Sequence, residues 1–180
     1  MSNKSIRDRR LESDFKGVSS LVNGSGGTLR IISTSGTPQS VYEIEYNCRG
    51  IERLNGGKPV FKDKHRIKIS IEGTDYPREK PNVHFLTPIY HPNVFPTNNV
   101  CLGDDYWTMA ENIAELILRV GKIIQYSPEV LNTRAPANSE ASKWAKRNSN
   151  LFPTDHKTFK SDSNSPSISW NDNPISWNNV

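Results

Sequence analysis

Residues 86–107, LTPIYHPNVFPTNNVCLGDDYW, form an irregular segment that is rich in Pro, Asn and Asp. A loop this long inside a compact domain is usually functional. Tyr90-His91-Pro92-Asn93 stands near its start, Cys101 follows Asn93 by eight residues, and Trp107 closes it. Because Cys101 lies on an irregular loop close to Gly103, we expect its thiol to be exposed.

Upstream of this loop, the pattern of apolar residues predicts one helix and a sheet. Five residues recur on one helical face: Leu11, Phe15, Val18, Leu21 and Val22. Four segments then have the alternation or the β-branched content of strands: residues 29–35, 42–48, 65–72 and 83–86. Cys48 falls on the apolar face of the second strand, so we interpret it as a core thiol. The Gly-rich run at residues 55–59 is interpreted as a loop. Short connections between the strands predict an antiparallel meander with one wet face.

Downstream, two helices are expected. Thr108 and Glu111 stand at the spacing of a capping box and would start the first. Its core stripe would be Ile113, Leu116, Ile117, Val120, Ile123 and Ile124. The second runs from about 139 to 148, with Ala141, Trp144 and Ala145 facing inward. The order helix, four strands, long loop and helices predicts an α+β fold.

Composition narrows the class of protein. The 180 residues carry a net charge of +4, with two Cys and four His, which argues against a disulfide scaffold and a closed zinc framework. No apolar run approaches the roughly 20 residues that span a bilayer. We therefore expect a cytoplasmic protein with no metal and no membrane or nucleic-acid partner.

The chain divides by composition into residues 1–155, one domain, and residues 156–180, a polar tail. The tail repeats one phrase, Ile168-Ser169-Trp170-Asn171 and Ile175-Ser176-Trp177-Asn178. Two interpretations stay open: a flexible tail whose repeat is chance, or a linear motif anchored by Trp170 and Trp177. The cations Arg7, Arg9, Arg10 and Lys16 around the first helix are likewise either a solvated face or a docking surface for an acidic partner.

The long loop and its flanks resemble the signature of ubiquitin-conjugating enzymes. The matching residues are Tyr76-Pro77, Pro81, Val83, Phe85, Thr87, Ile89, Tyr90, His91-Pro92-Asn93, Val100-Cys101-Leu102 and Trp107. The resemblance covers about residues 5–150, in the family's order of helices and strands. It implies the ubiquitin-conjugating fold, with an N-terminal helix, a four-stranded antiparallel meander, an active-site loop and C-terminal helices.

The resemblance also implies a function. Cys101 would accept a ubiquitin-like protein from an activating enzyme as a thioester and pass it to a lysine or another acceptor. A thiol is suited to both steps, because a thiolate is a good nucleophile and also a good leaving group. No cofactor is expected, since the activating enzyme uses the ATP. Asn93 would stabilise the oxyanion or support the loop, unless it is only a turn residue after Pro92. His91 would be structural. In this family the basic first helix is where the activating enzyme docks, which favours docking for its cations.

Departures from the family pattern are informative. Ala135 stands where many members carry an acid that positions the acceptor lysine, and Asp104, Asp105 or Asn132 are the candidates to replace it. Arg78 and the triplet at 108–110 replace residues that contact RING-type ligases, so recognition of such a ligase is doubtful. These departures indicate a divergent member, of the kind that a bacterial operon with its own modifier and activating enzyme would encode. Antiviral defence is one context for such an operon.

Two other functions are weighed against this one. Some relatives keep the fold, lack the Cys and only bind modifier, but the chain has both Cys101 and Asn93. A thiol hydrolase would pair Cys101 with His91 or His84 and would need a third group to orient the His. The sequence offers no such group.

Overall fold

The structure is a computed structural model, and it describes residues 4–103, 106–153 and 155–159. Its elements in chain order are α1 Ile6–Asn23, β1 Leu29–Ser35, β2 Val41–Tyr46, β3 Gly50–Asn55, β4 Lys58–Lys62, β5 His65–Ser70, β6 Asn82–Phe85, α2 Ile113–Ile124, α3 Ser139–Arg147 and a short 3₁₀ helix, η1 Ser149–Leu151. No helix in the described part of the chain is long and apolar enough to cross a membrane.

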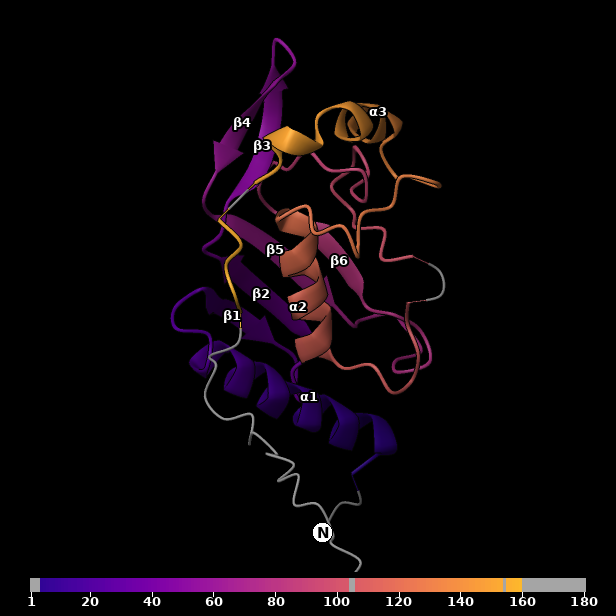
Figure 1. The fold of residues 1–180 in the computed structure, drawn as a ribbon. Coiled ribbons are helices and arrows are strands. Elements are labelled where there is room, and N and C mark those ends of the chain that lie inside the picture. The colour runs from indigo at the N-terminus through magenta and orange to yellow at the C-terminus, as the bar shows by residue number, and fades with distance from the viewer. Residues whose placement is uncertain (1–3, 104–105, 154, 160–180) are drawn as a thin grey trace, which may run out of the picture.

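A four-stranded antiparallel sheet, in the order β1-β2-β5-β6, forms the centre of the molecule. Helix α2 crosses one face of the sheet, α1 lies along one end, and α3 lies at the opposite end (Figure 1). The predicted α+β fold, with its N-terminal helix, antiparallel sheet and C-terminal helices, is confirmed.

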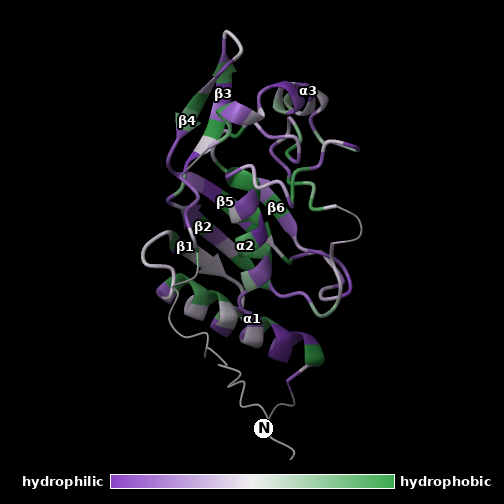
Figure 2. Cartoon of the chain, in the orientation of Figure 1, coloured by the Kyte–Doolittle hydropathy of each residue, from purple (hydrophilic) through white to green (hydrophobic). Residues whose placement is uncertain are grey.

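The core lies between α2 and the sheet. All six predicted stripe residues of α2 are fully buried, and they meet inward residues of the strands such as Tyr46 and Ile67. Hydrophobic and hydrophilic residues succeed each other in short stretches along α2 (Figure 2), as expected of a helix with one buried and one exposed side. This packing fixes the position of the long loop, because the loop connects β6 at the sheet's edge to the start of α2.

A second, two-stranded sheet was not predicted. Strands β3 and β4 pair antiparallel, and the Gly-rich run read as a loop contains their turn. Gly56 and Gly57 both have positive φ, 57° and 80°, as a two-residue hairpin turn of this kind requires. Trp144 of α3 donates a hydrogen bond to the carbonyl of Gly57 at 2.9 Å, so α3 secures the tip of the hairpin.

The predicted start of the second helix was wrong. Helix α2 begins at Ile113, and its N-cap is Asn112, whose side chain accepts a hydrogen bond from the N–H of Glu115. Thr108 and Glu111 instead form a separate turn, closed by a bond from the Glu111 N–H to the Thr108 carbonyl. The Asn112 side chain satisfies a free N–H at the helix start as a Thr cap would, so the spacing alone did not select the cap.

The chain remains packed beyond residue 155. Residues 155–159, here called the strap, run back from η1 past the sheet (Figure 1). Phe159 ends the strap, is only 6% exposed and meets the Tyr46 ring edge to face at 5.7 Å. Packing thus continues four residues past the predicted boundary, while Trp170 and Trp177 lie outside the described residues.

Candidate active site

Cys101 sits where the long loop folds back on itself. Val94 and Val100 form a single antiparallel bridge, and next to it the backbone N–H of Cys101 donates to the carbonyl of Asn93 at 2.7 Å. The thiol of Cys101 is free and its residue is half-buried. Cys48 is the contrast, because it is buried in the core and burial raises the pKa of its thiol. The structure therefore has one accessible thiol on the loop and one inert thiol in the core.

The Asn93 side chain joins this loop to the loop that follows α2. Its Nδ2 donates to the carbonyl of Val130 at 2.9 Å, and its Oδ1 accepts the backbone N–H of Asn132 at 2.9 Å. A longer contact, 3.5 Å, runs from Nδ2 to the carbonyl of Cys101. Asn93 is 2% exposed, so both ends of its amide are used inside the protein. Of the two predicted roles, this arrangement favours loop support.

His91 is buried and forms no described hydrogen bond with Cys101. Its Nδ1 accepts the backbone N–H of Asn93 at 3.0 Å, and its ring packs against the Tyr126 ring with centroids 4.3 Å apart. Burial lowers the pKa of His91 to about 3, so the ring is neutral near pH 7. His84 bonds instead to Asn99. The described hydrogen bonds thus give Cys101 no His partner.

Asn132 shapes the loop after α2. Its Oδ1 accepts the backbone N–H groups of Arg134 and Ala135, and its Nδ2 donates to the carbonyl of Ala135. The side chain is therefore bound within its own turn. Asp104 and Asp105, the other two candidates for positioning an acceptor lysine, lie outside the described residues.

Arg119 is a site residue that the sequence did not single out. Its guanidinium donates to the carbonyl of Leu102, next to Cys101, at 3.1 Å and lies over the Tyr106 ring, 3.8 Å from the centroid. Lys80 reaches the same segment from β6's side, through the carbonyl of Gly103 at 3.4 Å. In the sequence, Arg119 is the one Arg of the α2 segment. A charged residue beside an apolar stripe is normally interpreted as solvent-exposed, so Arg119 was not singled out.

The cations of α1 fall into two pairs. Arg7 donates to the carbonyls of Thr74 and Ile71, and Arg10 pairs with the buried Asp14 at 3.0 Å. Arg10 also donates to the carbonyls of Met109 and Glu111, so both cations hold α1 to the rest of the fold. Arg9 and Lys16 are exposed and seven residues apart, so they share one helical face.

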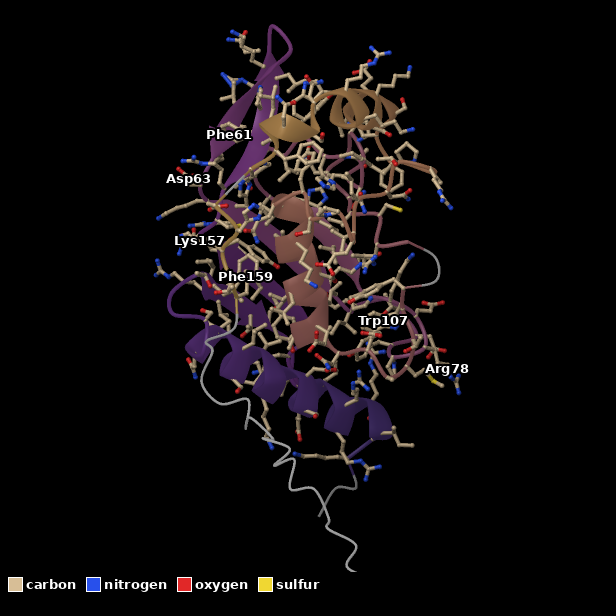
Figure 3. The ribbon with its side chains drawn as sticks, in the orientation of Figure 1. Phe61, Asp63, Arg78, Trp107, Lys157 and Phe159 are labelled. Carbon is tan, nitrogen blue, oxygen red and sulfur yellow. The ribbon has the colours of Figure 1, made fainter. Side chains whose placement is uncertain are left out.

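Two segments depart from the expected family pattern, one at Arg78 and one at residues 108–110, and both lie close to Trp107. Trp107 donates its indole N–H to the carbonyl of Pro77 at 2.8 Å, which ties these two segments together. Arg78 lies beside it, exposed, and pairs with Asp75 (Figure 3). Met109 is 61% exposed and is the large apolar side chain that this area presents.

Within residues 4–103, 106–153 and 155–159, no group of three or more His, Cys, Asp or Glu could hold a metal ion. The described residues around Cys101 supply a thiol, backbone dipoles, amides and the two cations Arg119 and Lys80.

Comparison with known proteins agrees with the geometry. A family model described as ubiquitin-conjugating enzyme matches residues 54–160, more than half of the chain. The chain belongs to this family. A curated ubiquitin-conjugating enzyme, the 20 kDa enzyme of Schizosaccharomyces pombe, is 27% identical over 97 residues, and the chain spans about half of its length (53%).

Solved ubiquitin-conjugating structures share the fold. A putative ubiquitin-conjugating enzyme from Trypanosoma cruzi matches with a TM-score of 0.59 at 21% identity, covering 83% of this chain and 94% of that one. Ubc12 of S. cerevisiae matches with a TM-score of 0.56 at 21% identity, covering 83% and 76%. At this identity the likeness shows the fold alone.

Proposed function

We propose that this protein is an active conjugating enzyme, in which Cys101 carries a ubiquitin-like modifier as a thioester. The observation that carries the proposal is the placement of Cys101: a free, half-buried thiol at the end of a bridged loop, with its N–H fixed by the carbonyl of Asn93. The family match at residues 54–160 supports it, because that range includes the loop and its Cys.

The proposed reaction has two acyl transfers. First, the Cys101 thiolate attacks the carbonyl carbon of the modifier's thioester on the activating enzyme, and that enzyme's thiolate leaves as the new C–S bond forms. Second, the amine of an acceptor lysine attacks the Cys101 thioester, the thiolate of Cys101 leaves, and the amine's proton passes to solvent as an amide forms. Both steps need an accessible thiol and neither needs a cofactor on this chain.

In this proposal the residues around Cys101 position the loop. Asn93 and Asn132 hold the loop after α2 against the Cys101 loop, and Arg119 holds the segment that follows Cys101. His91 supports the turn from within the protein as a neutral ring. A preorganised site of this kind keeps the acyl group in one orientation toward the incoming amine.

The bonding of the two His residues argues against a hydrolase. A triad requires a His within hydrogen-bond reach of the thiol, whereas His91 is engaged with Asn93 and His84 with Asn99. Direct attack by the acceptor amine on the thioester requires no such His.

We also propose where the activating enzyme docks. Arg9 and Lys16 present two exposed cations on one side of α1, which can meet an acidic surface without breaking a contact within the protein. Arg7 and Arg10 are assigned to the fold instead, since their guanidinium groups bind carbonyls and Asp14.

A charging assay tests the function. The chain is incubated with Mg-ATP and a modifier plus its activating enzyme: ubiquitin with its own enzyme, and any ubiquitin-like protein and activating enzyme that neighbouring genes encode. The proposal predicts an adduct that thiol reductant removes, none with Cys101→Ala, and a reductant-resistant ester with Cys101→Ser. If modifier binds the chain but never forms an adduct, the protein is a binding module of the same fold and not an enzyme.

A further inference from the structure

A groove of about 590 Å³ runs along the outer face of α2. Its floor is α2, one wall is the strap, and the other wall includes Tyr106 near the Cys101 segment. Figure 3 shows Lys157 and Phe159 of the strap beside α2, on the side away from Trp107. The volume falls within the range of sites that hold a small ligand or a large side chain.

The groove offers polar atoms that have no partner within the described structure. Gln125 lines it, is 6% exposed, and uses its Nε2 to hold the carbonyl of Lys157, while its Oε1 is buried and accepts no hydrogen bond. Nε of Arg119 is buried and likewise unpaired. A buried acceptor left unpaired costs about 1–3 kcal/mol, so the groove favours an occupant that brings an N–H donor.

The groove also has apolar walls. Leu118, Val130, Phe159 and the Tyr106 ring contribute to its lining. An occupant that combines a flat apolar body with one N–H matches both properties, and indole is the side chain of this kind, because its Nε1–H only donates.

The chain itself carries two indole side chains in the segment that follows the groove wall. The described part ends at Phe159, in the groove wall, and 21 residues follow it. Trp170 comes 11 residues later and Trp177 seven after that, each inside the repeated Ile-Ser-Trp-Asn phrase. Eleven residues can reach up to roughly 36 Å, which exceeds the length of about 18 Å of the 12-residue helix α2. Tethering also gives the tail an effective concentration of about millimolar.

We propose that the α2 groove is the binding site of the protein's own tail, residues 160–180. An indole of one Ile-Ser-Trp-Asn phrase packs against Phe159 and Leu118 and donates its N–H to Gln125. The bound tail would cover the face of α2 that adjoins the segment after Cys101, through Arg119 and Tyr106.

Amide NMR spectra of the full-length ¹⁵N-labelled chain test this site. The Trp170→Ala/Trp177→Ala double variant should shift the backbone amides of Leu118, Lys122 and Thr158 and leave those of the β3–β4 hairpin unchanged. The matched control is Ser169→Ala/Ser176→Ala, which keeps both indoles and should leave the groove amides in place. The Trp→Phe double variant keeps the rings but removes the N–H donors, and it should move the Gln125 side-chain amide signals.

A reciprocal variant keeps the tail intact. Lys122 lines the groove and its side chain is 46% exposed, so Lys122→Phe fills the groove with little effect on the core. It should move the two tail indole N–H signals to the positions they have in a synthetic peptide of residues 160–180. Groove amides that are the same in the wild type and the Trp→Ala variant would overturn the proposal, as would shifts on another face. Groove shifts that vanish on dilution would assign the site to the tail of a second copy and also contradict it.

Discussion

The side-chain oxygen of Asn93 accepts the backbone N–H of Asn132 at 2.9 Å, across 39 residues of sequence. The same amide donates to the carbonyl of Val130. One buried side chain therefore joins the loop that carries Cys101 to the loop after α2.

Asn93→Ala should lower the free energy of unfolding by about 1–3 kcal/mol, because it leaves the Asn132 N–H and the Val130 carbonyl without their partner. Chemical denaturation of the uncharged protein measures this. If Asn93 served only the oxyanion, the variant would lose rate at constant stability. Unchanged stability would therefore reject the loop-support role.

Acid should destabilise the fold through two buried histidines. Burial lowers the pKa of His91 to about 3 and that of His65 to about 4, below the ordinary value of 6.5. Between about pH 4 and pH 6.5, the two His side chains therefore bind protons in the unfolded chain but not in the folded chain. The stability from the two neutral rings is present above about pH 6.5 and falls by up to about 2.7 kcal/mol per pH unit toward pH 4.

The variant His91→Asn isolates one of these rings. Asn can place an acceptor near the position of Nδ1 and does not titrate in this range, so the slope of stability between pH 6 and 4 should decrease by up to about 1.4 kcal/mol per pH unit. Denaturant unfolding at several pH values provides both slopes, and the contributions of the carboxylates cancel in the difference. Equal slopes would show that His91 takes up its proton in the folded state.

The absence of a side chain at Gly121 should be what allows the strap to pack against α2. A Cβ built there lies 2.3 Å from Cε2 of Phe159 and 2.8 Å from its Cζ. Gly121→Ala should therefore displace the Phe159 ring and cost about 1–3 kcal/mol, although Ala favours a helix. Gly17→Ala on α1 is the matched control, because its Cβ would meet only Ala114 at 3.9 Å, and it should be neutral or stabilising. Thermal unfolding compares them, and equal effects would mean that the strap does not pack on α2.

The two pairs of cations on α1 should behave differently. Arg9→Glu/Lys16→Glu should slow charging by the activating enzyme and flatten its dependence on salt, at nearly constant stability. Arg10→Gln should instead lower stability by about 1–3 kcal/mol, because the buried Asp14 loses its cation. Charging rates at several ionic strengths, with melting curves alongside, separate the two. Wild-type charging kinetics in the double variant would exclude docking on this face of α1.

Much of the fold could be predicted from the local pattern of apolar residues in the sequence. The face of α1 and the stripe on α2 repeat with the helical period, so the sequence defines them without knowledge of the partner element. The β3–β4 hairpin did not follow, because Gly56-Gly57 can be read as a loop or a turn until its flanking strands are seen to pair. The helix start at Asn112 was missed because two capping residues stood near each other and only one lies at the helix end.

At the site, the sequence singled out candidate residues, whereas their hydrogen-bond partners came only from the structure. The resemblance to ubiquitin-conjugating enzymes marked Asn93 and Cys101, but the partners of Asn93 lie 37 and 39 residues away on a loop with no periodic pattern. Arg7 and Arg10 read as surface cations because their acceptors are mostly backbone carbonyls, which carry no signal in the sequence.

The most direct test of the proposed chemistry is the intact mass of the protein after charging with a modifier, its activating enzyme and Mg-ATP. A thioester on Cys101 predicts a mass gain of one modifier less one water, which reductant reverses and which Cys101→Ala abolishes while Cys48→Ala retains it. An adduct that survives in Cys101→Ala, or that depends on Cys48, would contradict the assignment of Cys101 as the carrier.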